Sequence, residues 1–183
     1  MLTASPCIQD VIRFALNTGL RIGEIFSLRW SDVDSENNLL NILAPKTQKR
    51  RAVPINGEAR KVLEYWALGR RNEFVFYNPE TRKPFVDLDA GFALACKKAG
   101  IEGVTWHTLR HTFASRLVNR GVDIVTVQQL LGHSTVTVTM RYTHTNLDSK
   151  RAAVAKLETS CDVLMTSAPK PSNEKAKVSQ MAR

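Results

Sequence analysis

Short amphipathic segments, each closed by a glycine, are the feature that most constrains how this chain can fold. Apolar residues recur at intervals of three and four from Ile8 to Leu16, and the next glycine is Gly19. Comparable segments close at Gly100, Gly121 and Gly132. Glycine commonly ends helices because it adopts a positive φ without steric cost. The pattern therefore predicts a set of short helices that pack together, and excludes a long coiled coil.

The sequence also marks where these helices begin. Ser5-Pro6 has the order of an N-cap followed by a proline at the first helical position, and Asn56 and Asp123 are further caps. Together the signals predict helices over 6–18, 21–28, 57–68, 87–98, 105–120, 123–131 and 146–158.

Two short segments read as strands that form a hairpin. They cover residues 38–44 and 52–55, and the segment 45–51 between them has four basic residues in seven. The alternating Thr-Val-Thr-Val-Thr at 135–139 is typical of a strand, whereas Ser134 before it could cap a helix. The local pattern leaves that segment open.

The charge balance points to a polyanionic partner. The chain has 26 Lys and Arg against 17 Asp and Glu, a net charge of +9. Such a partner is either nucleic acid or an anionic membrane surface, although many basic proteins bind neither. The basic residues are spread over a globular pattern and not gathered on one amphipathic helix, so we expect no membrane binding.

The cysteines and apolar runs exclude several classes of protein. Cys7, Cys96 and Cys161 are far apart and form no C-x-x-C pair, so neither a disulfide framework nor a zinc site is expected, and a cytoplasmic location fits. No apolar run is long enough to span a membrane, and the N-terminus does not have the form of a signal peptide.

The length of 183 residues suits one domain, which we place at 1–165. Residues 166–183 are poor in large apolar side chains and are expected to form a disordered, mildly basic tail.

Six residues could carry chemistry, although each has an ordinary structural explanation when it is taken alone. Arginines can be solvated or paired, as Arg21 could be with Glu24, and histidines can be packed or can lie at helix ends. The six are Arg21, Lys46, His107, Arg110, His133 and Tyr142.

The order of these residues and the words around them resemble the tyrosine recombinase (phage integrase) family. The words are TGLRIGE at 18–24, HTLRHTFAS at 107–115, LLGHS at 130–134 and RYTH at 141–144. The resemblance covers residues 5 to 158. It implies a mainly helical fold with a small antiparallel sheet (α+β), shared in outline with type IB topoisomerases, and it favours a helix over 135–142.

The resemblance also implies a reaction and a role for each residue. Tyr142 would attack a DNA phosphate and form a 3′-phosphotyrosyl link, without a metal or other cofactor. Arg21 and Arg110 would bind the phosphate, and Lys46 would protonate the leaving oxygen. His107 would act as the general base, and His133 would donate a hydrogen bond to the phosphate. Lys49, Arg50 and Arg51 would contact DNA. His111 lies about 100° round the helix from Arg110 and is expected to be structural, as is His144.

The resemblance implies double-stranded DNA as the partner and a tetramer on that DNA, with the helix at 146–158 docked on a neighbouring protomer. Larger family members have an N-terminal DNA-binding domain that we expect this chain to lack, as a fragment or as a truncated product. Two alternatives stay open: a catalytically silent DNA-binding remnant, and a type IB topoisomerase that relaxes supercoils.

Overall fold

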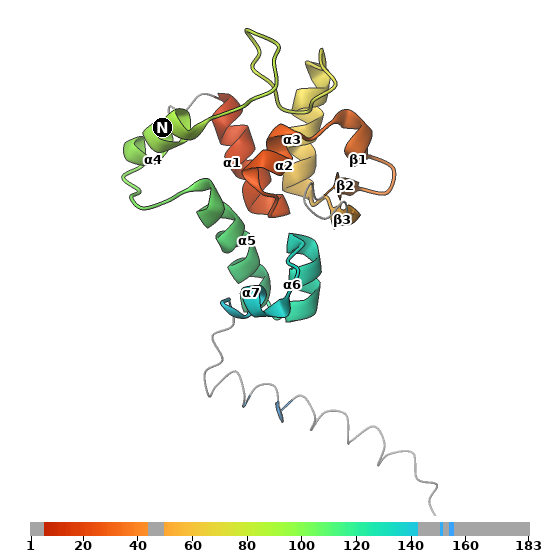
Figure 1. The fold of residues 1–183 in the computed structure, drawn as a ribbon, viewed down its shortest axis with the longest axis vertical. Coiled ribbons are helices and arrows are strands. Elements are labelled where there is room, and N and C mark those ends of the chain that lie inside the picture. The colour runs from red at the N-terminus through yellow and green to blue at the C-terminus, as the bar shows by residue number, and fades with distance from the viewer. Residues whose placement is uncertain (1–5, 44–49, 143–150, 152–153, 156–183) are drawn as a thin grey trace, which may run out of the picture. The chain divides into compact units, whose positions relative to one another are not determined.

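The computed structural model describes residues 6–43, 50–142, 151, 154 and 155. The chain divides into two units, Met1–Thr143 and His144–Arg183, and every element named below lies in the first. Figure 1 shows these elements along the chain. Lys46, Lys49, His144 and the tail predicted at 166–183 lie outside the described residues. Of the helix predicted at 146–158, residues 151, 154 and 155 are described, and they are helical.

Helix α1 (Pro6–Thr18) is the central element of the fold and packs against α3 (Gly57–Leu68) and α5 (Trp106–Asn119). Asn56 caps α3 by accepting a hydrogen bond from the backbone of Ala59, as predicted. The chain turns sharply after α1 at Gly19, where φ is +65°. A Cβ on Gly19 would lie 2.4 Å from a ring carbon of Phe113, so glycine also allows α1 to approach α5 closely.

The sheet has three antiparallel strands in the order β1 (Val33–Asp34), β2 (Leu39–Leu43) and β3 (Arg50–Pro54). Leu40 pairs with Val53, and both are buried. The sequence predicts β2 and β3 but not β1, which follows the short 3-10 helix η1 (Trp30–Asp32). Strand β1 has only two residues, too few to show alternation.

The helices predicted between residues 6 and 131 are confirmed with small changes in their bounds. Helix α2 is shorter than predicted (Ile22–Phe26), and α4 starts two residues later (Asp89–Lys98). Helix α6 (Ile124–Leu131) begins at its Asp123 cap and ends at Gly132 in the left-handed conformation.

The segment that the local pattern left open is helix α7 (Val136–Met140), as the resemblance implied. The strand interpretation is wrong because the buried face follows helical spacing. Thr139 and Tyr142 are buried and Val136 is partly buried, whereas Val138 is exposed. A strand would have put Val136 and Val138 on the same face. The predicted fold class, mainly helical with a small antiparallel sheet, is confirmed.

The buried apolar side chains form two clusters. The larger cluster joins α1, α3, the sheet and part of α5, and includes Phe14, Leu40 and Phe76. The smaller cluster lies among α5, α6 and α7, and consists of Ala114, Val127, Leu131 and Tyr142 with partly buried neighbours.

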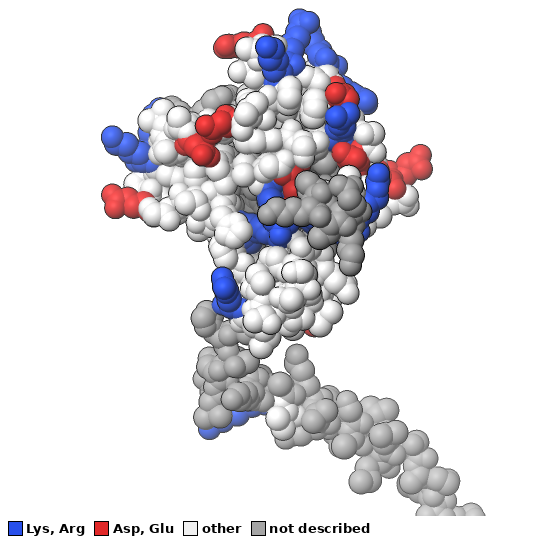
Figure 2. Space-filling view, viewed as in Figure 1, with Lys and Arg blue, Asp and Glu red and all other residues white. Residues whose placement is uncertain are grey.

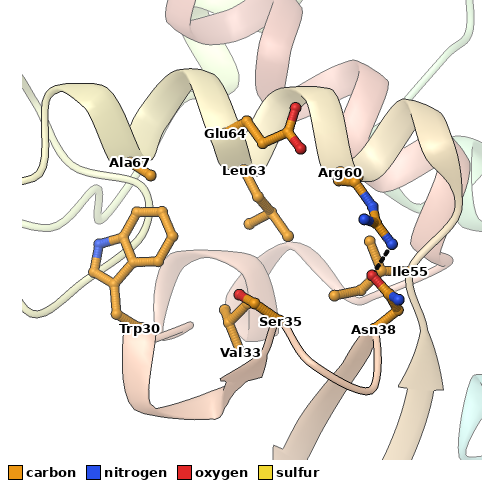
Figure 3. Close-up of a pocket in the computed structure, with 9 residues that line it drawn as sticks. All are labelled: Trp30, Val33, Ser35, Asn38, Ile55, Arg60, Leu63, Glu64 and Ala67. Carbon is orange, nitrogen blue, oxygen red and sulfur yellow. Dashed lines mark hydrogen bonds between the residues drawn. The ribbon is translucent and has the colours of Figure 1, made fainter.

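A small pocket lies between α3 and the segment from Trp30 to Asn38 (Figure 3). Leu63 and Ile55 form part of its wall, and Arg60 at its edge donates a hydrogen bond to Asn38. None of the five candidate residues that the structure describes lines this pocket.

Candidate active site

Arg21 lies at the start of α2, where a carboxylate holds it. It occupies the N-cap position, and Glu24, three residues on, accepts a hydrogen bond from its backbone N–H at 2.9 Å. The guanidinium of Arg21 donates to the other oxygen of Glu24 at 3.2 Å. The side chain of Arg21 is 45% exposed, whereas that of Glu24 is 6% exposed. Arg21 therefore has one fixed edge and a remainder open to a ligand.

Arg110, in the second turn of α5, is 1% exposed. Its Nη1 donates to the carbonyl of Gly19 at 2.7 Å, and its Nη2 donates to the carbonyl of Leu131. The Nε atom is buried without a partner. Backbone atoms at the ends of α1 and α6 thus fix this guanidinium, and charge-assisted bonds of this kind are the stronger class.

His133 follows the left-handed Gly132 that ends α6. Its Nδ1 is hydrogen-bonded to the hydroxyl of Thr139 at 2.9 Å, and its carbonyl accepts from the side chain of Gln128. Thr139 is fully buried, so it fixes the ring and leaves Nε2 as the other nitrogen. Burial, and then the charges of Arg110 and Arg21, lower the pKa of His133 to about 4. His133 is therefore neutral at pH 7.

Three aromatic rings lie next to one another between α5 and Tyr142. The rings of His107 and His111 are 4.6 Å apart, and those of His111 and Tyr142 are 5.2 Å apart. The sequence interpretation of His111 as structural overlooked this contact. His111 lies about 100° round the helix from Arg110, but it still faces the site because Tyr142, which follows α7, packs against its ring.

The electrostatics show that five of the six residues come together. Burial, together with the charges of Arg21 and Arg51, lowers the pKa of Arg110 to about 10, although Glu24 and Tyr142 act the other way. Burial, His111, Arg110 and Arg21 lower the pKa of His107. Such mutual effects need short distances, because charge interactions fall off with separation.

Tyr142 is 7% exposed and belongs to the smaller apolar cluster. Burial raises the pKa of its hydroxyl, and Arg110 and Arg141 counteract only part of that rise. The hydroxyl is therefore protonated at pH 7.

Of the three basic residues predicted to contact DNA, the two that the structure describes have different surroundings. Lys49, like Lys46, falls outside the described residues, and Arg50 is exposed at the start of β3. The side chain of Arg51 is only 12% exposed and is paired with Glu24. On the face in Figure 2, blue atoms of basic residues lie at several places, and one small group lies near the middle.

Sequence reasoning did not place Glu24 or Thr139 in the site. It considered Glu24 only as an ordinary structural partner of Arg21, and it did not identify Thr139 as the partner of His133. Spacing offered a signal for Glu24, since it lies three residues after Arg21 in a helix start. Thr139 gave no such signal, because its role depends on how α7 folds back toward α6.

The arrangement can bind a phosphodiester between fixed cations beside a tyrosine hydroxyl. In the described part of the chain, no three His, Cys, Asp or Glu side chains gather as a metal site requires. The same residues include no helix that is long and apolar enough to cross a membrane.

Comparison with known proteins identifies the family. Residues 4–148 match the model of the phage integrase family. The tyrosine recombinase XerA of Saccharolobus solfataricus is 34% identical over 141 residues, which cover 77% of this chain and 47% of that protein. The probable integrase/recombinase YoeC of Bacillus subtilis is 33% identical over 142 residues, which cover 76% of this chain and 78% of YoeC.

Solved structures of similar fold point to the same family. The integrase of transposon Tn1549, in complex with a circular intermediate DNA, superposes with a TM-score of 0.74 at 28% identity, over 85% of this chain and 61% of that one. A crystal structure of XerA recombinase gives a TM-score of 0.64 at 31% identity, over 85% of this chain and 64% of that one. The chain spans about half the length of XerA and of several other curated relatives. It belongs to the phage integrase family, the tyrosine recombinases.

Proposed function

We propose that this chain cleaves and rejoins DNA in site-specific recombination, by a metal-free transesterification in which Tyr142 is the nucleophile. The observation that carries the proposal is the buried guanidinium of Arg110, which two carbonyls fix and which interacts with Arg21, His133 and Tyr142. Family membership supports the same reaction class. The same reaction was expected from the resemblance alone.

In the proposed step the phenol oxygen of Tyr142 attacks the scissile phosphorus. A tyrosyl O–P bond forms, the bond from phosphorus to the 5′ oxygen breaks, and the 3′ end stays linked to the protein. One phosphodiester replaces another, so the step is nearly isoenergetic and reverses when a 5′-hydroxyl attacks the link. A hydroxyl from a different strand gives recombination.

Tyr142 needs help to react at neutral pH. With an ordinary pKa near ~10, about one tyrosine in a thousand is ionised at pH 7, a deficit of ~4 kcal/mol. Burial raises the pKa of Tyr142 and enlarges that deficit. A base must therefore take the proton as the O–P bond forms. His107 suits this role because its lowered pKa leaves the ring neutral and able to accept a proton.

The arginines supply charge where the transition state needs it. The phosphorane-like transition state has more negative charge than the diester, so fixed cations stabilise it preferentially. Arg110 is held by two carbonyls at a fixed place, where it interacts with both Arg21 and Tyr142. Arg21 adds a second, more exposed guanidinium. Neutral His133 donates from Nε2 when Thr139 holds its Nδ1 as the acceptor.

Lys46 completes the proposed set from the hairpin between β2 and β3. An ordinary lysine keeps its proton at pH 7 and can give it to the departing 5′ oxygen. Lys49 and Arg50, near the same tip, are proposed to contact the DNA backbone.

Double-stranded DNA is the proposed substrate, bound by a homotetramer during strand exchange. Relatives support DNA as the partner. XerH recombinase was solved bound to its difH substrate, and a dimer of lambda integrase was solved on a core site.

Covalent capture tests the proposal. The full chain is incubated with a pool of nicked duplexes of randomised sequence, denatured in SDS and examined for protein–DNA adducts. We expect adducts with the parent chain and with Tyr65→Phe, an exposed tyrosine that serves as the matched control. Tyr142→Phe removes only the attacking oxygen and should form none.

The outcomes separate the alternatives. Adducts that persist in Tyr142→Phe would contradict the assignment of the nucleophile. Salt-sensitive DNA binding without adducts in the parent chain would indicate a silent remnant. Adducts accompanied by supercoil relaxation but by no exchanged strands would favour a topoisomerase.

A further inference from the structure

Among the described arginines near the site, Arg51 makes the most hydrogen bonds through its guanidinium, and its partners are other residues of the chain. Its Nη1 and Nη2 donate to the two oxygens of Glu24 at 3.0 and 2.7 Å, a two-point pairing. Its Nε donates to the carbonyl of Leu130 at 3.1 Å. A side chain bonded in this way has little left to offer to DNA.

We propose that Arg51 is a positioning residue, which holds the end of α6 and the Glu24–Arg21 pair in register for the reaction proposed above. Arg51 belongs to β3, Glu24 to α2 and Leu130 to α6. One side chain thus joins three elements, each of which leads to a different member of the proposed site.

The first connection runs through Glu24. Its Oε1 accepts from both Arg51 and Arg21, at 3.0 and 3.2 Å. Without Arg51, Glu24 would be a buried carboxylate held by Arg21 alone. The two would then form a closer pair, and the Arg21 guanidinium would turn away from the phosphate.

The second connection runs through the end of α6. Successive carbonyls there accept from two different arginines, that of Leu130 from Arg51 and that of Leu131 from Arg110. His133 follows two residues later and is fixed by the same turn.

The turn at Gly132 packs closely against the side chain of Arg51. Gly132 has φ +63°, and a Cβ on it would lie 3.0 Å from both Cδ and Nη1 of Arg51. The guanidinium and its stem therefore lie directly against the turn that carries His133. Arg50, the neighbouring residue on the exposed side of β3, provides a matched comparison.

The first measurement is the salt dependence of binding to a mixed-sequence duplex. Arg50→Gln should lower the salt slope by about 1, as the loss of one phosphate contact does. Arg51→Gln should leave the slope unchanged. An equal fall in the Arg51 variant would show a DNA contact and overturn the proposal. This measurement does not depend on catalysis, so it decides whether Arg51 contacts DNA even if no adduct ever forms.

The second measurement is the rate of adduct formation on the nicked pool at saturating DNA, with folding checked by circular dichroism. Arg51→Gln should slow the reaction at least tenfold. Arg51→Lys keeps the charge but cannot reach Glu24 and Leu130 together, so it should fall in between. Arg71→Gln, at an exposed arginine outside the site, should react at the parent rate. A parent rate in folded Arg51→Gln would contradict the proposal.

A double variant shows whether Arg51 acts through Glu24. Combined with Glu24→Gln, the Arg51→Gln change should slow adduct formation much less than it does alone. Fully multiplicative losses would mean that Arg51 acts independently of Glu24 and would overturn this part of the proposal. Adducts absent from the parent chain would count against the proposed function instead.

Discussion

The two apolar clusters differ in size, and the site is divided between them. The larger cluster, around α1, α3 and the sheet, supports the turn from Gly19 to Glu24 that carries Arg21. The smaller one, among α5, α6 and α7, includes the ring of Tyr142 itself. Arg110 joins them through the carbonyls of Gly19 and Leu131. The proposed phosphate-binding side is thus built on the main core, and the proposed nucleophile on a part with less buried surface to lose.

This difference implies unequal local stability. Regions with few buried apolar contacts open more readily than the main core. We therefore expect the tyrosine side of the site to loosen first, while Arg21 keeps its place.

Two substitutions to alanine, one in each cluster, test this difference in stability and are expected to have the largest effects. Phe14 is fully buried in the larger cluster, 5.0 Å from the ring of Phe76, and Phe14→Ala should cost about 3–5 kcal/mol of unfolding free energy. Leu131 is fully buried in the smaller cluster, and Leu131→Ala should cost about 2–3 kcal/mol. Denaturant unfolding measures both losses.

Hydrogen exchange then locates each effect. Leu131→Ala should speed exchange mainly in α6 and α7, and Phe14→Ala should speed it throughout. A uniform increase in both variants would mean that the clusters unfold as one unit and would remove the distinction.

Arg110→Lys tests the connection between the clusters. A single ammonium can bond to one carbonyl strongly but cannot span Gly19 and Leu131 and also face a phosphate. Loss of one donor to a developing oxyanion costs about 2.7–4 kcal/mol, so adduct formation should fall roughly 100- to 1000-fold. Arg116→Lys, at an exposed position of α5, is the control and should react normally. An equal rate in Arg110→Lys would show that charge alone suffices.

The smallest expected effect is a pH dependence that arises at His133. Its pKa is about 4 in the folded chain, against an ordinary 6.5, so the unfolded chain takes up this proton first as pH falls. The contribution of His133 to stability is complete above pH 6.5 and decreases from there to pH 4. Unfolding midpoints of the parent chain and His133→Gln, measured across this window, should converge at its acid end. A gap that stays constant would contradict the assignment.

Most helices could be predicted from the sequence because their ends carry local signals. Asn56 and Asp123 cap helices with their own side chains, and Gly132 takes the left-handed conformation that ends α6. Strand β1 and helix α7 could not, because their conformations depend on partners. Strand β1 exists through pairing with β2, and α7 through the burial of Thr139 and Tyr142.

The residues of the candidate site could be predicted from the sequence, but the hydrogen bonds that hold them in place could not. Arg21, His107, Arg110, His133 and Tyr142 were found by their order, and the structure brings them together. That Arg110 bonds to carbonyls at positions 19 and 131 has no sequence signal, since every residue has a carbonyl. For the same reason, Arg51 in a basic run looked like an exposed residue.

The fixed guanidinium of Arg110 has a consequence for the order of events when a phosphate arrives. Arg110 loses its rotamer freedom when the chain folds, an entropy of about 2 kcal/mol that binding does not have to supply again. Arg21, with its side chain 45% exposed and one edge paired with Glu24, keeps part of that freedom. In the proposed reaction, the phosphate would therefore contact one guanidinium that folding has already ordered and one that binding orders further. Folding would then set the contact with Arg110 in advance, and the contact with Arg21 would adapt to the shape of the DNA.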